Sequence, residues 1–342
     1  MHEPPYRTEL KPYGRALADL ARGDPDIICL SGDLTRQCEV DLFAAEFPDR
    51  FIHGGMAEAN MIGVAAALAR KGLRPWVHTF GVFATRRPLD QIVNAVAYPN
   101  LPVRIVGFMP GVSSPGGPSH QAIDDVALMR ALPNMTVIDV ADAVETRQAV
   151  RAIANVDGPV YMRLKRGEIP VIFGDDHVFR LDQAAVLPRM ITATSGPGAD
   201  VALFASGMML STALATGRAL GARGIGVCVV NVPVIKPLDA ATVIEVAGRA
   251  RIVVTVENHL ITGGLGSAVA ETIAEAGLGR PLRRVGLRDT FAEGALTSGY
   301  LFEKYGLSTQ ALIETIWRSL GESGPPPPAP SVQAEAGEYS PV

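Results

Sequence analysis

Residues 57–80 read AEANMIGVAAALARKGLRPWVHTF. The small and apolar side chains from Ala57 to Lys71 recur at helical spacing, and a glycine-containing turn follows them. The next apolar run, Pro75–Phe80, has the length of a buried strand. A helix that leads through a turn into a buried strand is the repeating unit of α/β proteins. This stretch therefore predicts a mostly parallel sheet flanked by helices.

The same alternation extends on both sides of this unit. In the first half the expected strands are Asp26–Leu30, Pro75–Phe80, Val103–Met109, Met135–Val140 and Val160–Leu164. The helices expected between them are Leu10–Arg22, Ala57–Lys71, Pro88–Tyr98, Ile123–Ala131 and Ala143–Val156. In the second half the expected strands are Val201–Ala205, Ile225–Asn231, Arg251–Val256 and Leu282–Val285. The helices expected there are Met208–Leu220, Ala240–Ala247, Gly266–Ala276 and Thr309–Leu320.

The length of 342 residues predicts more than one domain, since a domain usually has about 100–200 residues. We predict two α/β domains, at residues 1–165 and 200–321. Residues 166–199 lose the alternation and are interpreted as a linker, in which we also consider a hairpin. The proline-rich, polar residues 322–342 cannot bury enough apolar surface to fold, so we predict a disordered tail.

Composition and charge exclude several classes of protein. The formal net charge is −4 without any basic stripe, which argues against nucleic-acid binding. No apolar run approaches the roughly 18 residues that span a bilayer, and the first residues contain no apolar signal segment. The three cysteines, Cys29, Cys38 and Cys228, are too few for a disulfide framework or a zinc site. We therefore expect a cytoplasmic protein that does not bind membranes and whose thiols are reduced.

Familiar phosphate-binding loops are also missing. No Walker A loop occurs, and the glycine-rich TGGLGSA at 262–268 lacks the spacing of a dinucleotide-binding fingerprint. We interpret it as a tight turn that leads into a helix. A nucleotide-hydrolysing or nicotinamide-dependent enzyme is therefore not expected.

Longer segments carry a family resemblance. PDRFIHGGMAEANMIGVAAALARKGLRPWVHTFGVFATRRPLDQI (48–92), GGPSHQAIDDVALMRALPNMTVIDVADAVE (116–145) and GPVYMRLKRGEIPVI (158–172) resemble the pyrimidine-binding domain of transketolases. VCVVNVPVIKPLD (227–239), TVENHLITGGLGSAVAE (255–271) and LFEKYGL (301–307) resemble the C-terminal domain of the same family. The order and spacing agree over most of the chain, and the resemblance is greatest to split, two-gene transketolases.

The resemblance implies thiamine diphosphate and Mg²⁺ as cofactors, and it also implies a partner. Transketolases hold the diphosphate and Mg²⁺ with a separate domain that carries a GDG motif and a downstream Asn. In this chain the GD pairs at 23–24, 32–33 and 174–175 are followed by Pro, Leu and Asp. We therefore expect no metal ligands here and an N-terminal transketolase subunit as partner. An α₂β₂ heterotetramer is expected, because the family builds its sites across a dimer interface.

Three residues carry the resemblance to the cofactor-activating site. Glu58 takes the position of the catalytic glutamate that shares a proton with the aminopyrimidine ring of the cofactor. The alternative is an ordinary first-turn glutamate that complements a helix dipole. Phe80 and Phe83 match the aromatic positions that pack on this ring, a contact that favours offset stacking. A third aromatic residue of the family is replaced by Arg86.

Further positions match contacts to the cofactor or the substrate. Asp33 and Leu34 match residues that line the cofactor near its thiazolium ring, and Met56, close to Glu58, is assigned to the same site. His120 matches a catalytic histidine on the substrate side, where imidazole can move a proton near neutral pH. Arg166 matches an arginine that binds a sugar phosphate, and a solvated residue of a Lys-Arg pair is the alternative.

Two departures from the family fall on donor contacts. Phe108 stands where the family has a histidine that binds a donor hydroxyl, and Gly116 stands where it has an aspartate. A site that loses hydroxyl-binding groups favours a less hydroxylated donor. The resemblance therefore implies intact cofactor machinery and an altered donor pocket.

Two-carbon (ketol or acyl) transfer, or a related carboligation, is the leading prediction, with a ketose or a 2-oxoacid as substrate. The alternatives are the β subunit of a 2-oxoacid dehydrogenase, another pyruvate-using thiamine enzyme, and a non-catalytic paralogue. The segments GGPSHQAIDD and VENHLITGGLG favour the transketolase branch. Retention of Glu58 with Phe80 and Phe83 argues against a paralogue without activity.

Overall fold

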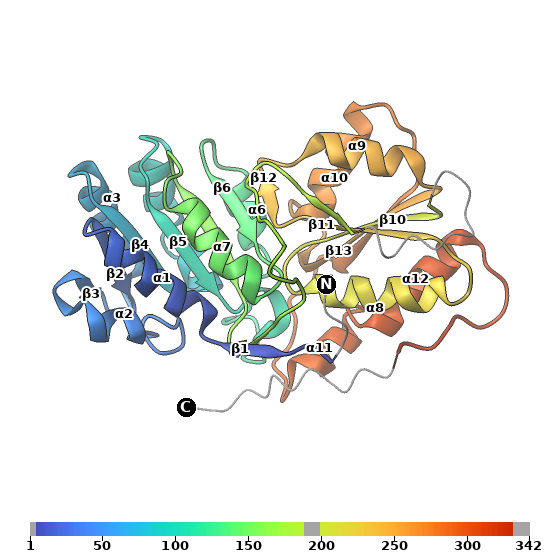
Figure 1. Cartoon of the computed structure of the whole chain (residues 1–342), viewed down its shortest axis with the longest axis horizontal. Helices are drawn as coiled ribbons and strands as arrows, with labels where there is room; N and C mark the ends of the chain where they lie inside the picture. The colour runs from blue at the N-terminus through green and yellow to red at the C-terminus, as the bar shows by residue number, and fades with distance from the viewer. Residues whose placement is uncertain (1–4, 188–198, 331–342) are drawn as a thin grey trace.

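Two separate sheets organise the chain, and each is flanked by helices (Figure 1). The computed structural model describes residues 5–187 and 199–330. The first sheet has seven strands in the order β12-β6-β7-β5-β4-β2-β3, and the second has five in the order β14-β13-β10-β11-β9. All pairs in the first sheet are parallel except the edge pair β12–β6. The prediction of two mostly parallel α/β units is confirmed.

The first unit is a three-layer sandwich. Its strands are β2 (Ile27–Ser31), β3 (Phe51–His53), β4 (Arg74–Phe80), β5 (Arg104–Phe108), β6 (Thr136–Asp139), β7 (Val160–Leu164) and β12 (Val234–Lys236). Its helices are α1 (Pro12–Gly23), α2 (Asp41–Glu46), α3 (Glu58–Arg70), α4 (Gly81–Thr85), α5 (Leu89–Gln91), a π-helical turn (Ile92–Ala97), α6 (Asp125–Arg130) and α7 (Ala143–Ile153).

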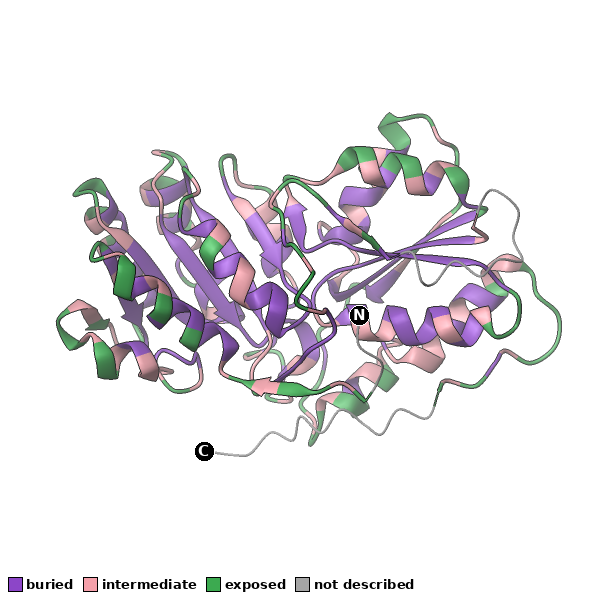
Figure 2. Ribbon diagram, viewed as in Figure 1, coloured by how far each residue is buried: buried purple, intermediate pink, exposed green. Residues whose placement is uncertain are grey.

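Alternation along the strands explains the two helical layers. Neighbouring residues of a strand point to opposite faces of a sheet. Accordingly, Cys29 belongs to the core shared with α1 and α7, whereas Leu30 packs in the core that contains α3. Val106 and Ile105 of β5 divide between the same two cores. Figure 2 shows that the strands are buried while the outer helix faces are exposed.

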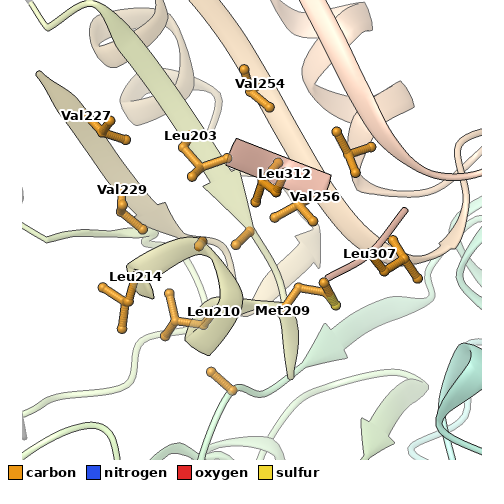
Figure 3. Packing of buried hydrophobic residues seen from close by; sticks show 14 of the residues in the cluster. Leu203, Met209, Leu210, Leu214, Val227, Val229, Val254, Val256, Leu307 and Leu312 are labelled. Atoms are coloured by element: carbon orange, nitrogen blue, oxygen red, sulfur yellow. The ribbon is translucent and has the colours of Figure 1, made fainter. Parts of the chain in front are cut away.

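The second unit repeats this architecture. Its strands are β9 (Ala185–Leu187), β10 (Val201–Ala205), β11 (Val227–Asn231), β13 (Ile252–Leu260) and β14 (Leu282–Leu287). Its helices are α8 (Met209–Gly221), α9 (Ala240–Arg249), α10 (Leu265–Glu275), α11 (Ser298–Lys304) and α12 (Thr309–Leu320). Helices α9 and α10 cover one face of the sheet, and α8 and α12 cover the other (Figure 1). Figure 3 shows Leu203, Val229 and Val254 of the strands packed with Leu210 and Leu312 of the helices.

The segment interpreted as a linker contains two short strands that join other parts of the chain. Strand β8 (Glu168–Pro170) pairs antiparallel with β1 (Thr8–Leu10), and β9 pairs antiparallel with β11. Within residues 166–187, therefore, the hairpin considered for this segment does not form. Its remainder, 188–198, falls outside the described residues.

The C-terminal residues pack on the second unit over a longer stretch than we predicted. We predicted a disordered tail from residue 322, but the backbone N–H of Ala329 donates to Gln310 Oε1 on α12 at 2.8 Å. Trp317 Nε1 of the same helix donates to the carbonyl of Gly324 at 3.1 Å. Residues 322–330 thus lie along α12, and 331–342 fall outside the described residues.

The two units meet through buried polar contacts. Asn258 at the end of β13 accepts from the N–H of Val112 at 2.9 Å and donates to the carbonyl of Pro110 at 3.0 Å. Ser206 of the second unit donates to Asp139 Oδ2 at 2.9 Å. Strand β12, which follows the second unit's β11, pairs with β6 of the first sheet. Among the described residues no helix has the length and apolar character needed to cross a membrane.

Candidate active site

The predicted site residues follow different parallel strands at one edge of the first sheet. Asp33 follows β2, Glu58 follows β3, Phe83 follows β4, His120 follows β5 and Arg166 follows β7. The carboxyl ends of parallel strands open onto a common crevice, which is where α/β proteins bind ligands. The topology therefore brings residues that are distant in the sequence to one edge.

Glu58 is the first residue of helix α3, and its side chain is only 6% exposed. The preceding residue, Ala57, provides no side-chain cap, so the carboxylate complements the partial positive charge of the helix N-terminus. Its Oε1 accepts a hydrogen bond from Arg87 Nη1 at 2.7 Å. The site thus holds a nearly buried carboxylate with one cationic neighbour.

Phe83 connects this carboxylate to the other predicted residues. Its half-buried ring is stacked with that of Phe80, with 6.0 Å between centroids and an interplanar angle of 21°. The imidazole of His120 meets the Phe83 ring at 73°, with centroids 5.3 Å apart. The guanidinium carbon of Arg87 lies 4.1 Å from the Phe83 centroid. Glu58, Phe80, Phe83 and His120 therefore form one continuous cluster.

The loop that carries His120 is held from two sides. Arg86 Nε donates to Asp124 Oδ1 at 2.9 Å, and its Nη2 reaches the carbonyl of Gln121. Gln121 itself is buried and donates to the carbonyl of Glu293 in the second unit at 3.1 Å. Arg86, which replaces a family aromatic residue, thus fixes the loop. His120 is held in place although its loop has no regular secondary structure.

Gly116 lies directly beside His120. A Cβ atom built at position 116 would be 3.1 Å from His120 Cβ, tighter than most such contacts in proteins. Ser119 Oγ is 2.9 Å from His120 Nδ1. The glycine at 116 therefore leaves room for the His120 side chain in its present position, which links the predicted departure at 116 to a catalytic candidate.

Phe108 is the register partner of Phe80 on the neighbouring strand and belongs to the same hydrophobic core. Its side chain is 0% exposed and meets the Tyr13 ring edge-on, with centroids 5.6 Å apart. Tyr13 in turn lies 2.6 Å from His78 Nε2, and burial lowers the pKa of His78 to about 4. The Phe108 ring is thus completely buried in the core of this chain. Its burial does not support the predicted contact with a donor.

The remaining predicted residues lie around the cluster. Met56 is 76% exposed in the loop before α3. Leu34 packs on the core of the first unit, whereas Asp33 is exposed. Asp33 and Arg166 both act on the buried thiol of Cys38: burial raises the pKa of Cys38, Arg166 opposes this shift and Asp33 adds to it. Asp33 and Arg166 therefore both lie close enough to Cys38 for their charges to act on its thiol.

Arg87 is the site residue that the sequence did not reveal. It follows Phe83 by four residues, a spacing that places two side chains on one face of a helical turn. The contact between Arg87 and Phe83 could therefore have been predicted from the sequence. The contact with Glu58, 29 positions away, depends on the tertiary structure.

Outside this cluster, the described residues form a cavity but no candidate metal site. Within residues 5–187 and 199–330, no group of three or more His, Cys, Asp or Glu side chains is arranged to hold a metal ion. A cavity of about 720 Å³ lies in the second unit, between the 177–186 segment and residues of α9. It shares no lining residue with the cluster around Glu58.

Comparison with known proteins agrees with the arrangement of the two units. The family model of the transketolase pyrimidine-binding domain matches residues 10–171, and that of the transketolase C-terminal domain matches residues 192–312. An uncharacterized transketolase family protein of Sinorhizobium fredii is 43% identical over 92% of this chain and 90% of its own length. The 6-deoxy-6-sulfo-D-fructose transketolase subunit of a Clostridium species is 41% identical over 88% of this chain and 91% of its own.

A solved structure is similar over nearly the whole chain. It is a split gene transketolase in an inactive β4 tetramer, 40% identical, with a TM-score of 0.81 over 91% of this chain and 97% of that one. The similarity to this structure spans both units, and so does the similarity to the two relatives above. The chain belongs to the transketolase family, as a split subunit that carries the pyrimidine-binding and C-terminal domains.

Proposed function

We propose that this chain catalyses thiamine-diphosphate-dependent two-carbon (ketol or acyl) transfer together with a partner subunit. The observation that carries the proposal is the placement of Glu58, nearly buried in the first turn of α3 and joined through Arg87 to the face of Phe83. A carboxylate and an aromatic face at one site are what a flat, proton-sharing heterocycle requires. The family to which the chain belongs supports the same cofactor.

The residues present fit the aminopyrimidine half of the cofactor. When bound, thiamine diphosphate supplies the carbon nucleophile for cleavage and formation of a carbon–carbon bond beside a carbonyl. Glu58 would hold a proton at its carboxyl group, at the edge of the ring. Phe83 would pack on the ring face, since offset stacking stabilises two flat aromatic groups. The buried Thr79 Oγ1 at the end of β4, without a hydrogen-bond partner in the described residues, adds a polar group that a ligand can satisfy.

His120 would act on the substrate side of this site. Its imidazole is fixed by Phe83 and by the loop contacts, so it can hold or move a proton at a defined position. Arg166 is proposed to bind a phosphate of the substrate, because a guanidinium group matches phosphate oxygens with two parallel hydrogen bonds. Asp33, Leu34 and Met56 would contact the rest of the cofactor.

The diphosphate and Mg²⁺ are proposed to bind on a partner chain. A divalent ion of this kind is held by oxygen ligands and by the phosphates themselves. The described residues provide no such cluster, and related chains are named as subunits or as a split gene product. We propose an α₂β₂ assembly in which this chain supplies the Glu58 side of each site.

The donor pocket is proposed to differ from that of an ordinary transketolase. The absence of a side chain at Gly116 removes a polar group beside His120, whereas Phe108 lies in the core. A relative is named for a 6-deoxy-6-sulfo sugar, which supports a donor other than a common ketose phosphate. We propose a donor that is less hydroxylated at the atoms facing residue 116.

Cofactor titration and exchange at the reactive carbon test the proposal. Calorimetry with thiamine diphosphate and Mg²⁺ is expected to show binding by the reconstituted complex and weak or no binding by this chain alone. In the complex, Glu58→Gln is expected to slow deuterium exchange at cofactor C2 by about 100-fold or more, because an amide cannot share the proton. Glu245→Gln, at an exposed ion pair, is the matched control. An unchanged exchange rate in Glu58→Gln would rule out the assigned role.

A further inference from the structure

Arg87 contacts the same two groups that are assigned to the cofactor ring. Its Nη1 is 2.7 Å from Glu58 Oε1, and its guanidinium carbon is 4.1 Å from the centroid of Phe83. One flat cation therefore lies on the aromatic face and donates from its edge to the carboxylate. The family resemblance assigns no role to this position.

A guanidinium group and an aminopyrimidine ring are similar in the features that matter here. Both are planar, both stack on aromatic faces, and both offer N–H or ring nitrogen edges to a carboxylate. Non-bonded atoms in contact are about 3.5–4.0 Å apart, and Arg87 lies 4.1 Å from the Phe83 centroid, so no second flat group fits between them on this face of the ring. A ring that stacks on this face of Phe83 and bonds to Glu58 Oε1 must therefore displace Arg87.

We propose that Arg87 holds the place of the aminopyrimidine ring in the free subunit and moves out when the cofactor binds. This inference rests on the proposed function of Glu58 and Phe83. In the free subunit the guanidinium neutralises a carboxylate that is only 6% exposed and covers an apolar ring. The cofactor would take over both contacts.

The surroundings of Arg87 allow this movement. Its side chain is 50% exposed, so it can turn into solvent without disturbing the core. It lies in the turn between α4 and α5, immediately before Pro88, where the helical hydrogen-bond pattern is interrupted. Arg86 differs: it is 28% exposed and bonded to Asp124 and two backbone carbonyls. Of these two neighbouring arginines, the side chain of Arg86 is held in place, whereas that of Arg87 can be displaced.

Displacing Arg87 lowers the affinity for the cofactor, because its contacts must be broken first. The complex of this chain with its partner subunit is titrated with thiamine diphosphate at saturating Mg²⁺, and the dissociation constant is measured by calorimetry. We expect Arg87→Met to bind about tenfold more tightly than wild type, which corresponds to about 1.4 kcal/mol. Arg87→Lys keeps the charge without the flat fork and is expected to fall between the two.

Two controls separate this effect from a general change in the protein. Arg249→Met removes an exposed arginine of an ion pair on α9 and is expected to leave the dissociation constant unchanged. Arg87→Gln removes the charge by a second route and should tighten binding in the same direction as Arg87→Met. Thermal unfolding of each variant shows that it is folded.

Equal or weaker binding by Arg87→Met and Arg87→Gln overturns the proposal, since Arg87 would then be a permanent support of Glu58. The proposed function survives that result if wild type binds the cofactor and Glu58→Gln fails to activate it. A wild-type complex that does not bind thiamine diphosphate overturns both.

Discussion

Arg163 of strand β7 and Asp125 of helix α6 form a completely buried ion pair, with Arg163 Nε 2.7 Å from Asp125 Oδ2. Arg163 also reaches Asp139 Oδ2 at 3.2 Å and the carbonyl of Asn258 at 3.1 Å. Burial alone would raise the pKa of Asp125, but the charge and hydrogen bonds of Arg163 outweigh it and hold that pKa below its usual value. This arginine ties the first sheet, the helix after the His120 loop and strand β13 together.

Removing Arg163 should therefore destabilise the whole chain. We expect Arg163→Met to lower the free energy of unfolding by about 3–5 kcal/mol, because Asp125 is left as an uncompensated buried charge. Urea denaturation followed by tryptophan fluorescence measures this change. Arg249→Met, from an exposed pair on α9, should change stability by less than about 0.5 kcal/mol. Similar losses in the two variants would contradict this account.

Glu39 should make stability depend on pH. Burial raises the pKa of Glu39 to about 7, although the backbone N–H groups of Gly14 and Tyr13 and the charge of Lys11 oppose it. The folded chain then keeps a proton that the unfolded chain loses above the ordinary glutamate pKa of 4.5, so stability falls as pH rises from about 4.5 to 7. We expect Glu39→Gln to reduce the drop in unfolding free energy between pH 5 and pH 8 by roughly 2 kcal/mol.

Part of the pH dependence should remain in Glu39→Gln. Burial also raises the pKa of Glu257 to about 7, so this second carboxyl acts in the same window. Urea titrations at several pH values measure the slopes of both proteins. Identical slopes would show that Glu39 does not titrate in this range.

Gly116 should control donor turnover through His120. In Gly116→Ala the new Cβ lies 3.1 Å from His120 Cβ, so the imidazole must shift. We expect kcat/KM for the donor to fall about tenfold, because small errors in the position of a catalytic group are costly, while the dissociation constant of the cofactor stays the same. Gly299→Ala, where a Cβ meets nothing within 4 Å, is the control. Unchanged kinetics in Gly116→Ala would separate residue 116 from the donor site.

Phe108 should act on stability rather than on the donor. Phe108→His places an imidazole in the core beside Tyr13, where unpaired ring nitrogens cost about 1–3 kcal/mol. Phe108→Leu, which adds no polar group, should be more stable than Phe108→His. We expect the ratio of kcat/KM for a hydroxylated and a deoxy donor to be the same in both variants. A clear change of this ratio in Phe108→His would restore the predicted donor contact.

Much of the fold could be predicted because it depends on local periodicity. Strand β7 and helix α12 have the bounds that the sequence indicated, Val160–Leu164 and Thr309–Leu320. Strand β12 escaped prediction because three residues give no periodic signal, and its partner β6 lies about a hundred positions earlier. Short strands of this kind are specified by tertiary pairing rather than by local sequence.

The candidate site could be predicted in part, for a similar reason. Motif positions located Glu58, Phe83 and His120, and the parallel topology then explains why they meet. The burial of Phe108 could not be predicted, because the sequence alone does not distinguish a phenylalanine in the core from one that lines a pocket. The pairing of Arg87 with Glu58 joins two segments whose approach depends on the sheet.

Strand β12 has a consequence for how the protein can be made. Val234 pairs with Ile138, and Lys236 Nζ donates to the carbonyl of Arg130 at 3.0 Å, so residues beyond 230 complete the edge of the first sheet. During synthesis on the ribosome, β6 remains an open edge until these residues have emerged. Open edges invite pairing with other chains. A truncated gene that ends near residue 199 should therefore yield an aggregating fragment, and the two halves should be expressed as one polypeptide.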